Sequence, residues 1–296
     1  MVMNIDCVDA DWLAQGRQSL EQGDLDAAAA ALRKAFQVPA MQLDAHNLIE
    51  RHGLKGCFGE WMGLNCEIAP ADDIFRFFAG HASCSYPIRD YLADGWRTLS
   101  ELMLLLERVD RPLAKVGRFL EFASGHGRFT RHLVKAIGAQ RVVVSDVVED
   151  AVRFSTERFG VHGVLSAREP AAVRWPGAFD VVFVLSLFSH LPEWTWAAWL
   201  RRLYEAVAPG GVLVFTTHGE YAARMQGVAL DSRGYFFVPS SESNAIDGAD
   251  YGTAFTSHAY VMAQIEECIG SGHLQEWAPR YFWAHQDAYV VARAAR

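Results

Sequence analysis

Two glycines and two acidic residues stand close together in the middle of the sequence, in a pattern that suits a nucleotide-like ligand. Gly125 and Gly127 directly follow the apolar run at residues 118–122. Because glycine has no Cβ, it allows a tight turn and a close approach of the backbone to a ligand. Asp146 ends the next apolar run, where a carboxylate can bind ribose hydroxyls. The pattern predicts a site for an adenosine-containing cofactor.

The neighbours of these glycines distinguish between two kinds of cofactor. The dinucleotide fingerprint G-x-G-x-x-G needs a third glycine, and Thr130 stands at that position. Glu121, just before the turn, would repel a pyrophosphate group, but it suits a cofactor that carries an amino group and a sulfonium. We therefore favour a sulfonium cofactor over a nicotinamide dinucleotide.

The apolar pattern around this turn predicts alternating strands and helices. We expect strands at residues 118–122, 141–146, 163–166, 180–186 and 212–217, and helices at 128–137, 149–159 and 192–207. Such alternation with short turns implies a parallel sheet with helices on both faces. Two later runs, at 281–283 and 288–292, are separated by a tight turn and predict an antiparallel edge.

Three further parts of the chain differ in composition. Residues 1–53 are alanine-rich and helical, and their spacing resembles one tetratricopeptide repeat; the alternative is a generic helical hairpin that docks on the main domain or on a partner. Residues 54–110 predict an ordered cap, in which Gly95 is one of several breakers before a linker helix at 96–108. Residues 111–296 form the cofactor domain, with a mostly irregular lid insertion at 218–278.

The bulk composition restricts the class of protein. The chain has 296 residues with 51% hydrophobic composition, which is enough for one α/β domain plus an extension. A net charge of −8 does not favour nucleic acid as a partner. The five cysteines are scattered without a C-x-x-C pair, so we expect no metal site. We find no signal peptide and no membrane-spanning run, and we expect a cytoplasmic protein without membrane contact.

The segment Glu-Phe-Ala-Ser-Gly-His-Gly at residues 121–127 resembles the E/D-x-G-x-G-x-G motif of class I S-adenosylmethionine-dependent methyltransferases. The resemblance continues over residues 117–217 and the two closing strands. It implies a doubly wound, mostly parallel seven-stranded α/β sheet of the Rossmann-like type, with S-adenosylmethionine as donor and S-adenosylhomocysteine as product. Ala123 departs from the motif by replacing its first glycine, and an alanine fits there if its φ is negative.

The resemblance also assigns cofactor contacts to residues that follow four of the strands. In this sequence they are Glu121, Ala123, Gly125, Gly127, Asp146, Ser166, Ala167, Ser186 and Leu187, and in the cap Tyr86 and Arg89 are candidates that would cover the cofactor. The glycines would lie against the methionine part, and Asp146 would bind the ribose. Ser166 and Ala167 would lie beside the adenine, whereas Ser186 and Leu187 would line the sulfonium side.

Catalytic and substrate candidates lie in the segments that follow the fourth and fifth strands. His218 is the preferred general base, with Glu220 as its orienting partner; His190 is a second candidate, or else a structural histidine. Three residues of the lid, Tyr235, Glu242 and Tyr251, are candidates for substrate contact, with scaffolding of the lid as the alternative.

These features predict an enzyme that methylates an oxygen or nitrogen atom of a small molecule or of a modified sugar or peptide metabolite. One alternative is a non-catalytic S-adenosylmethionine-binding or scaffold module that uses the helical N-terminus. A nicotinamide oxidoreductase is the third possibility. The expected partner is a small-molecule acceptor, and the N-terminal helices could support a homodimer or a protein complex.

Overall fold

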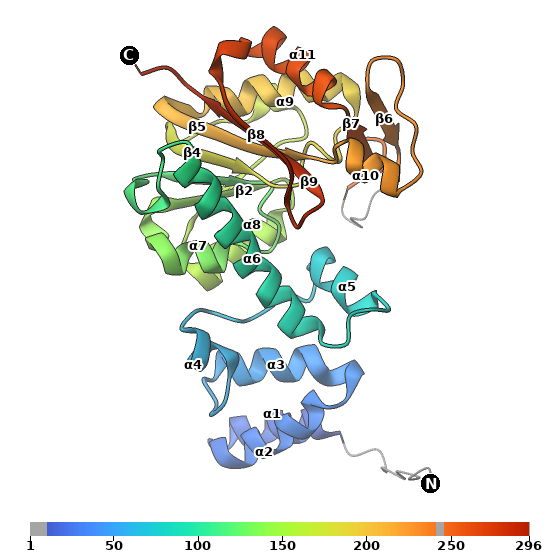
Figure 1. The fold of residues 1–296 in the computed structure, drawn as a ribbon. Coiled ribbons are helices and arrows are strands. Elements are labelled where there is room, and N and C mark those ends of the chain that lie inside the picture. Colours follow the sequence, from blue (N-terminus) through green and yellow to red (C-terminus); the bar gives the residue numbers. More distant parts are fainter. Residues whose placement is uncertain (1–10, 241–245, 296) are drawn as a thin grey trace. The chain divides into compact units, whose positions relative to one another are not determined.

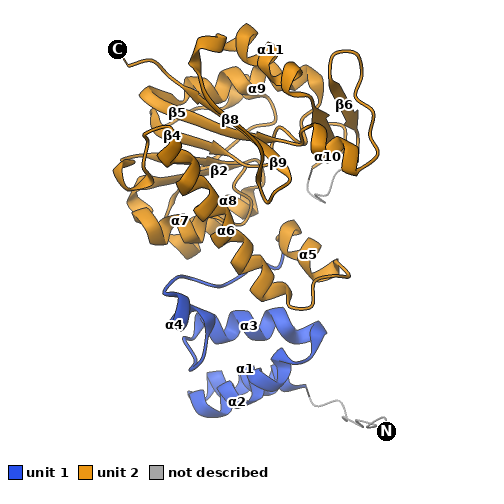
Figure 2. Ribbon diagram, in the orientation of Figure 1, with its two compact units in different colours: residues 1–71 blue, residues 72–296 orange. Residues whose placement is uncertain are grey.

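The computed structural model describes residues 11–240 and 246–295 and divides the chain into two compact units, Met1–Ala71 and Asp72–Arg296 (Figure 2). The sequence-based division into domains after residues 53 and 110 stays a prediction, because compactness alone does not define an independently folding domain. Within the described residues, every helix is too short or too polar to cross a membrane.

The first unit is built from helices. They are α1 (Trp12–Glu21), α2 (Leu25–Phe36), α3 (Gln42–Arg51) and α4 (Phe58–Met62). Asp11 and Asp24 cap the first two helices, since their carboxylates accept hydrogen bonds from the backbone of Ala14 and Ala27. The core of this unit contains the small side chains of Ala28, Ala29, Ala35 and Ala45 together with Leu32 and Leu54, so the helices can pack closely.

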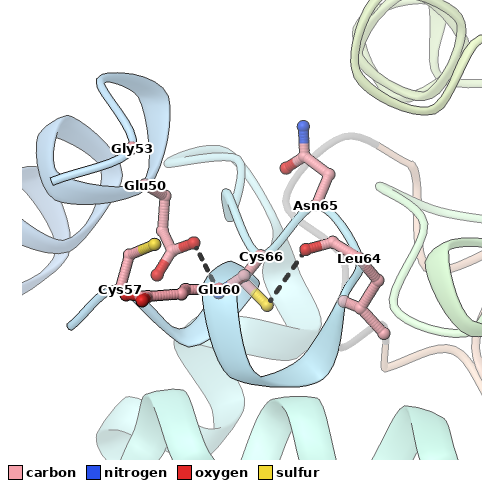
Figure 3. Close-up of a pocket in the computed structure, with 8 residues that line it drawn as sticks. Glu50, Gly53, Cys57, Glu60, Leu64, Asn65 and Cys66 are labelled. Atoms are coloured by element: carbon pink, nitrogen blue, oxygen red, sulfur yellow. Dashed lines mark hydrogen bonds between the residues drawn. The ribbon is translucent and has the colours of Figure 1, made fainter. Parts of the chain in front are cut away.

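A pocket of about 350 Å³ lies in this unit between the end of α3 and the segment around α4 (Figure 3). Glu50 is its buried acid, and its two carboxylate oxygens accept hydrogen bonds from the backbone of Phe58 at 2.5 Å and of Gly59 at 2.9 Å. These are donors at the start of α4, where a helix leaves its N–H groups unpaired. The carboxylate of Glu50 therefore supports the local fold.

The second unit is built on a seven-stranded sheet in the order β3-β2-β1-β4-β5-β9-β8. The strands are β1 (Phe119–Phe122), β2 (Val142–Asp146), β3 (His162–Leu165), β4 (Phe179–Val184), β5 (Val207–Thr217), β8 (Leu274–Phe282) and β9 (Gln286–Ala292). The first five are parallel, and β9 is antiparallel to both β5 and β8. The predicted doubly wound, mostly parallel sheet with an antiparallel edge is confirmed.

Helices cover both faces of this sheet (Figure 1). On one face lie α9 (Glu193–Glu205) and α11 (His258–Cys268), and on the other lie α6 (Pro87–Arg108), α7 (Thr130–Ile137) and α8 (Glu149–Phe159). Along β1, Leu120 and Phe122 join the core beneath α9, whereas Phe119 joins the core beneath α6. Because both faces are covered, the strands are apolar on both sides.

Helix α6 is longer than the sequence pattern predicts. It begins at Pro87, after the short helix α5 (Asp73–Gly80), and not at residue 96. Gly95, interpreted from the sequence as a breaker, lies inside α6. A Cβ added to Gly95 would lie 2.2 Å from the carbonyl oxygen of Arg128. The glycine is therefore needed for the close approach of the loop before α7, and it does not end the helix.

The segment between β5 and β8 is more regular than predicted. It contains α10 (Glu220–Met225), the two-stranded hairpin of β6 (Tyr235–Val238) and β7 (Thr253–Thr256), and α11. The β6–β7 hairpin is held against the loops that follow β4 and β5, because Ala254 N donates to Ser189 O at 2.7 Å and Thr256 N donates to His218 O at 2.9 Å. Its role as a lid stays a prediction.

Candidate active site

The turn after β1 has a left-handed backbone at three alternating positions. The φ angles are 58° at Ala123, 54° at Gly125 and 79° at Gly127. The condition under which alanine fits this position, a negative φ, is therefore not met, and an L-residue in this region costs about 1–2 kcal/mol. A Cβ added to Gly127 would lie 2.3 Å from the ring of Phe159, whereas a Cβ on Gly125 would meet nothing within 4 Å. Gly125 thus faces open space, where a ligand can approach the backbone.

Asp146 connects the end of β2 to this glycine turn. Its Oδ2 accepts a hydrogen bond from Gly125 N at 2.8 Å, and its Oδ1 accepts one from Val148 N at 2.9 Å. Burial raises the pKa of Asp146, while these backbone donors lower it. A carboxylate has about four acceptor positions. Asp146 can therefore hold the turn in place and still accept hydrogen bonds from ribose hydroxyls.

Glu121 lies near the end of β1, in a place where a carboxylate is unfavourable without a cation. Its side chain is buried and its Oε2 accepts a hydrogen bond from Thr130 Oγ1 at 2.6 Å. Burial raises the pKa of Glu121 to about 8; the bond from Thr130 lowers it, and the charge of Asp146 raises it further. A cationic ligand group beside Glu121 would stabilise its ionised form. The site therefore fits a cofactor with an ammonium group at this end.

Three residues form a closed ring of hydrogen bonds at the turn that follows β4, through their side chains and one backbone N–H. Ser186, whose φ is 62°, donates from its backbone N to Thr216 Oγ1 at 2.8 Å. Thr216 Oγ1 donates to Gln286 Oε1 at 2.6 Å, and Gln286 Nε2 donates to Ser186 Oγ at 2.7 Å. Of these three residues, the sequence predicts a cofactor contact only for Ser186. Polar residues inside the apolar strand β5 and at the start of β9 were the available signal.

His218, the predicted general base, lies in a cluster of rings. Its ring centroid is 5.9 Å from that of His190, 5.3 Å from that of His285 and 5.3 Å from that of Phe255. Burial, followed by the charges of His190 and His285, lowers the pKa of His218 to about 3. The ring is therefore neutral at neutral pH and is a weak base, so its catalytic role stays a prediction.

The side chain that contacts the His218 ring nitrogen is Gln286, and the partner predicted from the sequence is Glu220. The Nε2 atom of His218 lies 3.4 Å from Gln286 Nε2. Glu220, by contrast, is the exposed first residue of α10. The orienting role predicted for Glu220 stays a prediction, and Gln286 is the contact that the structure provides.

His190 connects the loop after β4 to the β6–β7 hairpin. Its Nδ1 is 2.6 Å from the carbonyl oxygen of Gly252, and its ring stacks on Tyr251 with the centroids 4.5 Å apart. This geometry favours the structural alternative for His190. Tyr235 is also buried, and its hydroxyl donates to Leu191 O at 2.6 Å. Glu242, the remaining substrate candidate, lies outside the described residues.

The other predicted cofactor residues follow β3 and β4, or lie at the start of α6. Ser166 follows β3 and donates from its N to Asp146 O at 2.8 Å, and Leu187 is buried in the core beneath α9 with Ala167 packed at its edge. Tyr86 is exposed, and the guanidinium of Arg89 lies 4.5 Å from its ring centroid. The hydrogen bonds seen in the described residues do not connect this pair to the glycine turn, and its covering role stays a prediction.

Comparison with known sequences gives a consistent result. A family described as a methyltransferase domain matches residues 93–246. A malonyl-[acyl-carrier protein] O-methyltransferase from Prosthecochloris aestuarii is 30% identical over 155 residues, which are 50% of this chain and 56% of that protein. The chain thus matches little more than half the length of this relative.

Solved structures of methyltransferases match this chain at low sequence identity. Streptomyces venezuelae DesVI is 16% identical with a TM-score of 0.49, and the match covers 77% of this chain and all 100% of that one. The magnesium protoporphyrin IX methyltransferase of Synechocystis with bound S-adenosylhomocysteine is 14% identical with a TM-score of 0.48, and the match covers 75% of this chain and 94% of that one.

Proposed function

This chain belongs to the methyltransferase domain family, and from that premise we propose that it transfers a methyl group from S-adenosylmethionine to an oxygen or nitrogen atom of a small acceptor. The family match spans more than half of the chain. The class I S-adenosylmethionine-dependent methyltransferase family and fold inferred from residues 117–217 are confirmed.

The observation that carries the proposal is the pairing of a buried acid with an open glycine turn. Glu121 can bind the amino group of the donor, Gly125 offers open backbone for its methionine part, and Asp146 can bind its ribose. Bound S-adenosylmethionine supplies an electrophilic methyl group on a sulfonium. The protein must hold the acceptor atom in line with that methyl group, and such positioning can supply about 7–11 kcal/mol of the barrier.

The two candidate bases, His218 and His190, favour a methyl acceptor that reacts without a strong general base. His218 has a pKa of about 3, and His190 is engaged with the Gly252 carbonyl. A carboxylate oxygen or an uncharged nitrogen is already nucleophilic at neutral pH, whereas an alcohol gains from a general base. The O-methyltransferase relative makes oxygen the first atom to test.

Calorimetry with three ligands tests the proposal. We expect S-adenosylmethionine and S-adenosylhomocysteine to bind, and NAD not to bind. Asp146→Ala should weaken S-adenosylhomocysteine binding at least about tenfold, which corresponds to about 1.4 kcal/mol. Asp150→Asn is the matched control, because Asp150 contacts His126 at the rim of the same loop and is half exposed. A folded protein that binds NAD and neither sulfur compound would overturn the proposal in favour of the oxidoreductase.

A further inference from the structure

The ring formed by Ser186, Thr216 and Gln286 joins parts of the chain that lie far apart in sequence. Ser186 follows β4, Thr216 lies in β5, and Gln286 is the first residue of β9. Thr216 is fully buried and Gln286 is 3% exposed. Buried polar groups of this kind must satisfy one another, because water does not reach them.

Each hydrogen bond in this ring has only one possible donor. The backbone N–H of Ser186 is a donor, so Thr216 Oγ1 accepts from it and has its own proton to give to Gln286 Oε1. That bond orients the amide of Gln286, whose nitrogen then faces Ser186 Oγ at 2.7 Å and His218 Nε2 at 3.4 Å. A single side chain of β9 thus contacts the loops after both β4 and β5.

The residue held by this ring has an unfavourable backbone conformation. Ser186 has a φ of 62°, in the region that glycine adopts more easily than serine. Such strain persists only where surrounding contacts enforce it. Ser186 also follows the carboxyl end of β4, the strand that pairs with β1, and ligands bind outside the carboxyl ends of the strands in an open α/β sheet.

We infer that Gln286 is a positioning residue, which holds the left-handed turn at Ser186 in the shape that the methyl-donor site requires. The inference rests on the proposed function for the identity of the ligand. Gln286 acts through Ser186 and Thr216, and it need not touch the donor itself. An antiparallel strand thereby contributes to a site that the parallel strands otherwise form.

Neighbouring threonines of β5 provide a matched test. Thr216→Val removes the hydroxyl from the ring, whereas Thr217→Val makes the same change at a buried hydroxyl outside the ring. We expect Thr216→Val and Gln286→Met to weaken S-adenosylhomocysteine binding about tenfold in calorimetry, and Thr217→Val to leave it unchanged within about twofold. Chemical denaturation confirms that each variant is folded.

A double-mutant cycle separates positioning from a general loss of stability. Ser186→Gly relieves the backbone strain and also removes the Oγ that accepts from Gln286 Nε2, so the turn no longer depends on Gln286. In that background Gln286→Met should weaken binding less than about threefold. An equal loss in both backgrounds, or unchanged binding in Gln286→Met and Thr216→Val, would overturn the inference.

Hydrogen exchange on the ligand-free protein gives a second readout. Gln286→Met and Thr216→Val should speed exchange at the amide of Ser186, and Thr217→Val should not. Faster exchange in all three variants, or in none, would overturn the positioning role. If the wild-type protein does not bind S-adenosylhomocysteine at all, the proposed function itself fails, and this outcome is distinct from the variant results.

Discussion

Thr130 donates a hydrogen bond of 2.6 Å to Glu121, so the residue that replaces a glycine after the turn binds the acid that precedes it. Thr130 and Glu121 are the two residues that depart from a dinucleotide-binding pattern, and in the structure they contact each other. This contact keeps a buried carboxyl partly satisfied while its pKa remains near 8. A carboxyl with that pKa changes its charge within the range in which many proteins are studied.

Glu121 should make stability depend on pH. Its pKa is about 8 in the folded protein against 4.5 for a free glutamate, so its stabilising contribution is present below about pH 4.5 and is lost as the pH rises through about 8. Glutamine does not ionise, so the Glu121→Gln variant does not lose stability in this way. Measured by urea denaturation, the free energy of unfolding of the variant minus that of the wild type should increase by at least about 1 kcal/mol from pH 5 to pH 8.5. If the variant and the wild type differed in free energy of unfolding by the same amount at both pH values, the raised pKa of Glu121 would be contradicted.

Ala123→Gly should stabilise the protein. The φ of 58° at Ala123 strains an L-residue, and glycine removes that strain at some cost in unfolded-state entropy. We expect a gain of up to about 1 kcal/mol in thermal or chemical denaturation. Ala171→Gly is the control, since Ala171 is an exposed alanine of a 3₁₀ turn without a positive φ, and its replacement should cost about 0.5–1 kcal/mol. Destabilisation by both changes would show that the turn tolerates alanine without strain.

The imidazole of His218 should stay uncharged in mildly acidic solution. Burial lowers its pKa to about 3, so the folded protein resists its protonation, and the stability that this ring contributes is lost as the pH falls below the ordinary value of 6.5. An NMR titration of the ring nitrogens should show no protonation of His218 between pH 8 and pH 4. If the His218 ring titrated near pH 6.5, it would be basic enough to act as a general base, and the lowered pKa would be contradicted.

Two substitutions at His190 should separate its hydrogen bond from its shape. His190→Phe keeps a ring to stack on Tyr251 but loses the bond to the Gly252 carbonyl, whereas asparagine can place a donor near the position of Nδ1. We expect His190→Phe to speed hydrogen exchange over β7, with a loss of about 1–3 kcal/mol for the unsatisfied carbonyl, and His190→Asn to change it less. Equal protection in both variants would show that the hairpin does not depend on this bond.

The sequence predicts those parts of the site that are local in the chain. The glycine turn, Glu121 and Asp146 follow apolar runs directly, so reading the runs as strands places these residues at one edge of the sheet. The φ of Ala123 depends on the packing around the turn, which no local pattern shows. The contacts of Gln286 escape prediction because its partners lie 70 and 100 residues away, and only the insertion of β9 beside β5 brings them together.

The place of β9 in the sheet also governs the order in which the protein can be completed during synthesis. Strands β1 to β5 emerge from the ribosome first, and β5 then has apolar residues on both faces and an unpaired edge until β9 has been made. Such an edge can pair with other chains. Until β9 is made, the β5 edge is therefore open to pairing with other chains, and the pairing that brings Gln286 to Thr216 also closes that edge.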